Sequence, residues 1–284
     1  MTRENIYQPF EIIYKEVDSC PVVPHQHTFF ELIYIVEGSG IQYVNGNSIR
    51  FETGHLFLLT PQDTHHFELD VRTRFFFLRF SQVYLNRQQT ALMYTQDWRQ
   101  RMEFILGNAS HQPGCLLYAA ADKQLVPALV DGLLKEDEGR QLYHGEVISQ
   151  LVNTLITIVA RNIALKLPEQ VKDNTAVMAL NLIRYIQEHI YSPQELRAEV
   201  VAKQFGISVS YLGRYFRKHT GENMQDYITN YKLKLVEIRL QHSDMRINEI
   251  AAELNFTDES HLNRLFKKYR GMNPSAFRKQ AAVA

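Results

Sequence analysis

Residues 249–271, EIAAELNFTDESHLNRLFKKYRG, repeat a stretch that occurs earlier in the same chain, VVAKQFGISVSYLGRYFRKHTG at 200–221. The two stretches align when one extra residue is allowed in the turn of the second. Each has a short apolar helix pattern, a tight turn and a second helix pattern that ends in a basic cluster. This succession predicts two helix-turn-helix motifs, whose second helices enter the major groove of DNA.

The turn residues support this prediction. Gly206 and its counterpart Asn255 stand where the chain must reverse direction, and these residue types best tolerate the left-handed conformation. Ser208 in the first unit, and Thr257 or Asp258 in the second, supply oxygens that can cap the following helix. The alternative is a plain helical bundle with a solvated basic face.

The segment between the two units, residues 224–241, predicts a helix of 18 residues. Such a helix is roughly 27 Å long, enough to hold two recognition helices about one turn of DNA apart, on the order of 34 Å. After residue 173 the chain has 16 Lys and Arg against 11 Asp and Glu, a net charge of +5, whereas the part before it has 15 against 20, a net charge of −5. The basic C-terminal part therefore favours an anionic partner.

Residues 247–279, INEIAAELNFTDESHLNRLFKKYRGMNPSAFRK, resemble the second helix-turn-helix of the AraC/XylS family of bacterial transcription regulators. The positions that carry the resemblance include Phe256, Asp258, Ser260, Arg264, Phe266, Lys267, Gly271, Pro274 and Arg278. The resemblance covers about 100 residues and implies two modules that bind adjacent major grooves of double-stranded promoter DNA.

By this resemblance, the side chains that face bases are Ser210, Arg214, Ser260, His261, Asn263 and Arg264. Arginine can pair with guanine and asparagine with adenine, which favours Arg214, Asn263 and Arg264 as the specific contacts. The side chains suited to phosphates are Arg217, Lys218, Lys267 and Lys268. Gly213 occupies a base-facing position without a side chain, so the first module is expected to contribute less base recognition.

The chain from Pro9 to about Phe80 has the pattern of strands. Aromatic and β-branched runs at 28–38, 40–54, 55–61 and 73–81 alternate with turn residues, and Asn45-Gly46 predicts a type I′ hairpin. Short antiparallel strands at this spacing are typical of a small barrel or jelly roll. The predicted fold class is therefore α+β and multidomain: an N-terminal β-barrel with following helices, then an all-α domain with two helix-turn-helix modules.

The barrel segment resembles the cupin superfamily. His25, His27, Glu31 and Gly38 follow the pattern His-x-His-x3-Glu-x6-Gly, and His66 lies in a segment that resembles the second cupin motif, although adjacent His65 leaves the fourth ligand open. The predicted effector pocket comprises His25, His27, Glu31, Tyr43, His66 and Arg79. The alternative is a metal site of His25, His27, Glu31 and His66, a set suited to Zn, Fe, Mn or Ni. No cofactor is predicted otherwise.

From about residue 96 the period becomes helical. Val147, Ile148, Leu151, Val152, Leu155, Ile156 and Val159 share one broad stripe. The stripe can pack against the barrel, against the same helix of a second copy, or against both. The predicted organisation is a cupin-like effector-sensing barrel at 1–95, a helical dimerisation segment at 96–165, a linker at 166–175 and the DNA-binding domain at 176–284.

Together these features predict a cytoplasmic transcription regulator that is not an enzyme and has no membrane span. The resemblance to the AraC/XylS family implies a small-molecule effector, a sugar or related metabolite. The effector is expected to bind the barrel of a homodimer and to alter promoter occupancy or contact with RNA polymerase. Two alternatives stay open. One is a cupin metalloenzyme fused to a DNA-binding tail, and the other is a constitutive DNA binder whose barrel serves dimerisation.

Overall fold

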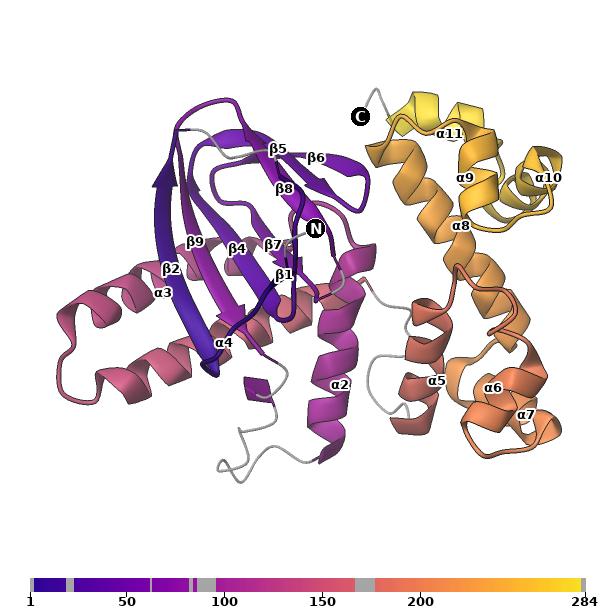
Figure 1. The fold of residues 1–284 in the computed structure, drawn as a ribbon, viewed down its shortest axis with the longest axis horizontal. Helices are drawn as coiled ribbons and strands as arrows, with labels where there is room; N and C mark the ends of the chain where they lie inside the picture. Colours follow the sequence, from indigo (N-terminus) through magenta and orange to yellow (C-terminus); the bar gives the residue numbers. More distant parts are fainter. Residues whose placement is uncertain are drawn as a thin grey trace. The chain divides into compact units, whose positions relative to one another are not determined.

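A computed structural model describes residues 3–18, 23–61, 63–81, 84–85, 96–166 and 177–281 (Figure 1). The chain divides into two compact units, Met1–Leu167 and Pro168–Ala284. Apart from Lys166, the predicted linker at 166–175 lies outside the described residues. Each unit is described by itself.

The N-terminal unit is built on a sandwich of strands. These are β1 (Arg3–Glu4), β2 (Phe10–Val17), β3 (Gln26–His27), β4 (Phe30–Glu37), β5 (Ser39–Val44), β6 (Asn47–Glu52), β7 (Leu56–Leu59), β8 (His65–Leu69) and β9 (Thr73–Phe80). A four-stranded sheet has the order β2-β9-β4-β7, a three-stranded sheet has the order β6-β5-β8, and β1 pairs with β3. This arrangement confirms the predicted cupin-like β domain.

The strand runs that the sequence predicts correspond to β4, β5, β6, β7 and β9. The hairpin between β5 and β6 is confirmed, because Asn45 and Gly46 have φ of 51° and 76°, as a type I′ turn requires. Strands β2 and β8 were not distinguished in the sequence. β8 matters for function, because it contributes one of the buried histidines described below.

Two apolar layers result from the alternation of side chains along the strands. On one face of β4, Ile33 and Ile35 join a core with residues of both sheets, among them Phe51 of β6 and Phe67 of β8. On the other face, residues such as Leu32 join a second core with the helices that follow the sheet. The four-stranded sheet is therefore buried on both sides.

The helices of this unit are α2 (Gln96–Gly107), the 3-10 helix η1 (Asn108–His111), α3 (Ala120–Gly139) and α4 (His144–Ala164). The apolar stripe of α4 lies in the second core, which confirms the prediction that it packs against the barrel domain. The exposed positions of the helix include Gln150, Thr154 and Arg161, so its outward face is largely polar. Val147, at the start of the stripe, stays exposed, and Leu151 is partly buried.

Helix α4 also has the length and hydropathy of a membrane span, with a mean hydropathy of 1.4 in its most apolar window. Half of that window is buried inside the fold. Residues Val152, Leu155 and Val159 are almost completely buried against the sheet and its neighbouring helices. The apolar character of α4 is accounted for by this packing.

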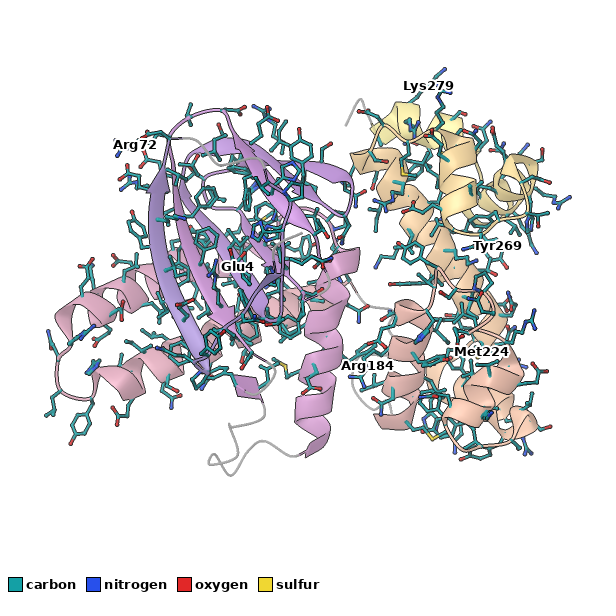
Figure 2. All side chains as sticks on the ribbon, in the orientation of Figure 1. Glu4, Arg72, Arg184, Met224, Tyr269 and Lys279 are labelled. Carbon is teal, nitrogen blue, oxygen red and sulfur yellow. The ribbon has the colours of Figure 1, made fainter. Side chains whose placement is uncertain are left out.

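The C-terminal unit is helical throughout its described residues. It contains α5 (Val177–Glu188), α6 (Ala198–Gln204), α7 (Val209–Thr220), α8 (Met224–His242), α9 (Ile247–Glu253), α10 (Glu259–Arg270) and α11 (Pro274–Ala281). The predicted helix at 224–241 is α8, which begins at Met224 (Figure 2). The pairs α6–α7 and α9–α10 are the two predicted helix-turn-helix modules, and α8 runs between them (Figure 1).

The turns of both modules have the predicted conformation. Gly206 and Asn255 have φ of 64° and 55°, in the left-handed region. The Ser208 side chain accepts a hydrogen bond from the backbone N–H of Tyr211, and the Asp258 side chain accepts one from that of His261. These caps fix the first residue of each recognition helix, α7 and α10.

Candidate DNA-binding surface and effector site

Helix α7 presents one apolar and one polar side. Leu212 and Phe216 are completely buried and hold the helix in its module. The predicted base-facing residues Ser210 and Arg214 are exposed. Gly213, between them, is also exposed, and a Cβ added there would meet no atom within 4 Å. The predicted phosphate contacts on this helix, Arg217 and Lys218, are exposed as well.

Helix α10 repeats this arrangement with more polar side chains. Leu262 and Phe266 are completely buried, and the exposed residues are Ser260, Arg264, Lys267 and Lys268. Asn263 is half-buried. The exposed set brings a guanidinium, which has the donor geometry to pair with guanine, and two ammonium groups to one helix.

His261 differs from its neighbours on α10. Its side chain is half-buried, and its ring meets that of Phe256 edge-on at 5.9 Å. The His261 ring therefore packs against the turn of the module. It is less accessible for a base contact than the exposed side chain of Arg264.

Helix α7 carries a row of aromatic side chains that was not predicted from the sequence. The ring of Tyr215 lies 5.5 Å from that of Tyr211 and 4.3 Å from that of His219. Tyr211 is 44% exposed and occupies the place in the first module that His261 occupies in the second. The signal in the sequence was the spacing of four residues, which puts side chains on one side of a helix.

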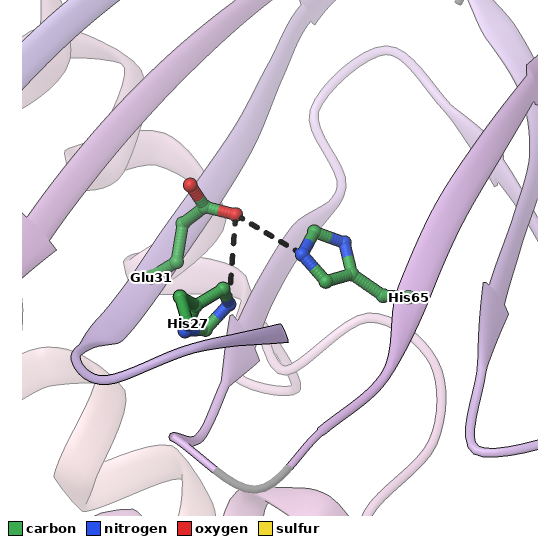
Figure 3. A group of neighbouring side chains, drawn as sticks. All are labelled: His27, Glu31 and His65. Atoms are coloured by element: carbon green, nitrogen blue, oxygen red, sulfur yellow. Dashed lines mark ion pairs between the residues drawn. The ribbon is translucent and has the colours of Figure 1, made fainter. Parts of the chain in front are cut away.

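The N-terminal unit contains a buried cluster of ionisable groups, drawn in Figure 3. His27 on β3, Glu31 on β4 and His65 on β8 offer ligand atoms that all lie within 4.8 Å of one another. Glu31 Oε2 is 4.0 Å from His27 Nε2 and 3.6 Å from His65 Nε2. All three residues are at least 98% buried. The sandwich thus brings His65 of β8 beside His27 and Glu31, which are neighbours in the sequence.

Arg79 on β9 completes this cluster. Its Nε donates to Glu31 Oε1 at 2.8 Å. The guanidinium also lies 3.3 Å from Glu4 and 3.7 Å from Glu11, and it is 5.2 Å from the ring centre of Phe29. Three carboxylates, one buried and two partly exposed, thus surround a single guanidinium.

Proton positions follow from the hydrogen bonds. His27 Nδ1 lies 2.7 Å from the carbonyl oxygen of Phe29, so Nδ1 carries the proton and the lone pair of Nε2 faces Glu31. Burial lowers the pKa of His27 to about 4 and also lowers the pKa of His65. Burial raises the pKa of Glu31, and Arg79 opposes that rise. Both imidazoles are consequently neutral near pH 7.

Three nitrogen atoms of the cluster lack hydrogen-bond partners among the described residues. These are His27 Nε2, His65 Nδ1 and His65 Nε2. Buried polar atoms without partners are uncommon in proteins and often indicate a bound group. Two imidazoles and one carboxylate are also ligands that transition metals accept, so the chemistry of the cluster suits a divalent ion.

The structure corrects two of the predicted pocket residues. His66 follows His65 on β8 and points to the opposite side of the sheet, because successive side chains alternate. Its ring stacks on that of Tyr43 at 4.5 Å, and the Tyr43 hydroxyl donates to Glu68 at 2.9 Å. His66 and Tyr43 therefore lie outside the cluster. The histidine of β8 that joins His27 and Glu31 is His65, and not His66 as predicted.

The remaining predicted pocket residues stay together. His25 is paired with His65 through backbone hydrogen bonds, and their rings are 4.3 Å apart. It flanks the cluster but does not belong to the set of ligand atoms within 4.8 Å. His27, Glu31 and Arg79 are in direct contact or nearly so, as described above.

A pocket lies at another part of the sandwich interior. It is lined by Gln42, Asn47 and Phe57 from the strands and by Gln112 from the segment after η1. Gln42 and Gln112 are buried, and Gln112 Nε2 donates to the carbonyl oxygen of Ile163, near the end of α4, at 3.1 Å. This pocket could not be predicted from the sequence, because Gln112 reaches the strands only through the packing of the helices.

Comparisons with known proteins agree with this architecture. The family "AraC-like ligand binding domain" matches residues 18–103, and the family "Helix-turn-helix domain" matches residues 201–280. The HTH-type transcriptional activator RhaS of Escherichia fergusonii is 24% identical over 256 residues, which cover 89% of this chain and 86% of that protein. RhaS of Salmonella arizonae is 26% identical over 265 residues, with the same coverage of each chain.

A solved structure, the unsaturated fatty acid-bound ToxT of Vibrio cholerae, aligns over 95% of this chain and 94% of its own, with 11% identity and a TM-score of 0.38. The family assignment rests on the matches to the two domain families and to the RhaS proteins. The chain belongs to the AraC/XylS family of transcriptional regulators, with a cupin-like ligand-binding domain followed by a DNA-binding domain of two helix-turn-helix modules.

Proposed function

We propose that this regulator senses a small polar molecule at the cluster of His27, Glu31, His65 and Arg79. The observation that carries the proposal is the burial of these groups together with the unpartnered nitrogens of the two histidines. Clusters of buried ionisable groups with shifted pKa values are typical of binding sites. The cluster is the first candidate, and the pocket beside Gln42 and Gln112 is the second.

The proposed effector is a sugar or a related metabolite. Nε2 of His27 can accept a hydrogen bond, neutral His65 can donate one and accept one, and Glu31 and Arg79 supply an acceptor and donors, a combination that suits neighbouring hydroxyl groups. The protein acts as a regulator and not as an enzyme in this proposal. It works in the cytoplasm as a homodimer, and effector binding changes promoter occupancy or contact with RNA polymerase.

In the DNA-bound state, α7 and α10 lie in adjacent major grooves. The proposed base contacts are Ser210, Arg214, Ser260, His261, Asn263 and Arg264, and the proposed phosphate contacts are Arg217, Lys218, Lys267 and Lys268. The exposure of both arginines and of all four phosphate-contact residues supports this assignment. Arg264 is the strongest candidate for a specific contact.

The effector proposal is tested by thermal unfolding of the full chain with a panel of neutral monosaccharides and sugar acids. A sugar that binds the cluster should raise Tm in the unchanged protein, because ligands that bind only the folded state stabilise it. Glu31→Gln should abolish that rise. Glu68→Gln is the matched control, since Glu68 lies on the outer side of the sheet beside Tyr43. A rise that survives Glu31→Gln contradicts the proposed site.

A divalent metal ion is a second candidate for the same cluster. The observation in its favour is that ligand atoms of His27, Glu31 and His65 lie within 4.8 Å of one another, with the lone pair of His27 Nε2 directed toward Glu31. These residues would hold the ion, which could in turn bind an oxygen of the effector.

Metal analysis of protein purified without chelator tests this candidate. A resident ion predicts about one equivalent per chain in the unchanged protein. His65→Ala should remove it, whereas His66→Ala, one residue further along β8 on the other side of the sheet, should retain it. A content near zero in the unchanged protein excludes a resident metal, and equal content in both variants contradicts the assigned ligands.

A further inference from the structure

The second helix-turn-helix module is fastened to the linking helix α8 by oppositely charged side chains. Arg239 of α8 makes two hydrogen bonds with the carboxylate of Glu253 at the end of α9, one of them 2.9 Å long. Glu237 of α8 accepts a hydrogen bond from Arg270 at the end of α10. Because one residue of α8 is acidic and the other basic, each attaches to a different helix of the module.

The turn of the second module has attachments of its own. Asn255 Nδ2 donates to the carbonyl oxygen of Tyr191 at 3.0 Å. Tyr191 lies between α5 and α6, and α5 packs against the first module through the rings of Tyr185 and Phe205. This hydrogen bond therefore joins the turn of the second module to the segment that leads into the first. Phe256 is the next residue of the turn, and the centre of its ring lies 5.6 Å from Nζ of Lys232 in α8. The turn is thus held from two sides.

Tyr191 also adjoins the ion pair between Arg239 and Glu253. Burial raises the pKa of the Tyr191 hydroxyl, with Glu253 adding to the rise and Arg239 opposing it. Tyr191, Arg239, Glu253 and Asn255 therefore form one polar junction, at which the first module, the linking helix and the second module meet. We call these four residues the inter-module junction.

The first module is fastened to the other end of α8. Gln187 of α5 donates to the Tyr227 hydroxyl at 3.0 Å, and Asn230 donates to Glu222 at 3.1 Å. Its turn differs from that of the second module, because a Cβ added to Gly206 would meet no atom within 4 Å. The direct polar link through a turn residue is therefore found at Asn255 and has no counterpart at Gly206.

We propose that the inter-module junction sets the distance and angle between α7 and α10, and thereby the spacing of the two groups of bases that the protein recognises. Arg239, Glu253 and Asn255 are positioning residues in this proposal, since they contact neither bases nor phosphates themselves. The linking helix fixes the approximate separation of the modules, and the junction prevents the second module from rotating about the end of that helix.

The physical consequence is a strict dependence on DNA spacing. One added base pair moves the second group of bases by about 3.4 Å along the duplex and turns it by roughly 34° about the axis. A module that cannot rotate loses its base contacts under such a shift. A module released from the junction can follow the displaced bases at a smaller loss of affinity.

Two substitutions weaken the junction while sparing the fold. Asn255→Gly keeps a residue that tolerates φ of 55° and removes the hydrogen bond to Tyr191. Glu253→Gln keeps the size of the side chain and removes its charge. The matched control is Gln225→Ala, an exposed position near the start of α8 and outside the junction.

The test begins with duplexes selected from a random library by the full-length protein. Affinity is then measured on the selected duplex and on versions with one base pair inserted or removed between the two recognised groups. For the unchanged protein and for Gln225→Ala, the altered spacing should cost about tenfold or more, comparable to a lost base contact. For the double variant Glu253→Gln, Asn255→Gly, the cost should fall to about threefold or less.

The ratio of affinities separates positioning from general damage. A variant that is merely less stable binds all three duplexes more weakly, and the ratio between them does not change. An unchanged ratio in the double variant overturns the proposal. A selected sequence with a single recognised group also overturns it, because no spacing would then exist for the junction to set.

Discussion

In the first module Gly206 forms the turn and Gly213 stands among the residues proposed to face bases, whereas in the second module these places belong to Asn255 and Asn263. Both turns adopt a left-handed backbone, and both recognition helices begin at a side-chain cap. The two modules therefore share a backbone and differ in the side chains that they offer to DNA and to each other.

Because their side chains differ, two copies of one motif can contribute differently to base specificity and to affinity for the DNA backbone. The second module has an amide at the position where the first has no side chain, and its turn is tied to the rest of the domain. We expect the second module to contribute more of the base specificity. The first module, with exposed Arg217 and Lys218, is expected to contribute mainly affinity for the DNA backbone.

The largest predicted effect concerns Arg264. Arg264→Ala should cost about 1–3 kcal/mol of binding free energy on the preferred duplex and relax the base preference at one position. Arg214→Ala should cost less, because its neighbour Gly213 makes no base contact. Affinity measured over a set of single-base variants of the selected duplex checks both. An equal loss on every duplex would mean that Arg264 does not recognise a base.

A smaller effect is expected for a phosphate contact. Lys268→Ala should weaken binding to all sequences alike and reduce the slope of log affinity against log salt concentration by about 0.9. Titrations at several salt concentrations measure this slope. A change in base preference without a change in slope would contradict the phosphate assignment.

Removing the side-chain cap of each recognition helix compares how much the two caps contribute to the free energy of unfolding. Asp258→Ala and Ser208→Ala should each lower the free energy of unfolding by about 0.5–2 kcal/mol, because each leaves the backbone N–H that it bonds without its partner. The loss at Asp258 should be the larger, since its negative charge also interacts favourably with the helix dipole. Urea unfolding at low and high salt distinguishes the two contributions, and equal losses would argue against a charge effect.

The two glycines of the first module should respond in opposite directions to the same substitution. Gly213→Ala should stabilise the protein by up to about 1 kcal/mol, because alanine favours the helix and its Cβ meets no neighbour. Gly206→Ala should destabilise it by about 1 kcal/mol, because its φ of 64° strains a residue with a Cβ. Thermal unfolding of both variants checks the sign, and the same sign for both would refute the comparison.

Much of the C-terminal domain could be predicted because its signals are local. The spacing of apolar residues gave the recognition helices, and the pairs Gly206 with Ser208 and Asn255 with Asp258 gave the turns and caps. The exposure of Arg214 and Arg264 follows from their place beside buried residues on the same helix. The inter-module junction was not predicted, because it joins Tyr191 to residues far along the chain.

The N-terminal site was predicted only in part for the same reason. His27 and Glu31 lie close in the sequence and were identified together, but the choice between His65 and His66 depends on which side of β8 faces the interior. A strand alternates its side chains, so a shift of one residue exchanges the inside with the outside. Both histidines were candidates from the sequence, and no local pattern distinguished His65 from His66.

Local patterns along the chain were enough to predict the two kinds of domain, the repeated helix-turn-helix and the polar residues of its recognition helices, since each depends on neighbours within a few positions. Two features depend on the folded protein: His65, and not His66, joins His27, Glu31 and Arg79, and a hydrogen bond ties the second module to Tyr191, just before the first. Contacts between distant strands and helices depend on the register and packing of whole elements, which no short stretch of sequence records.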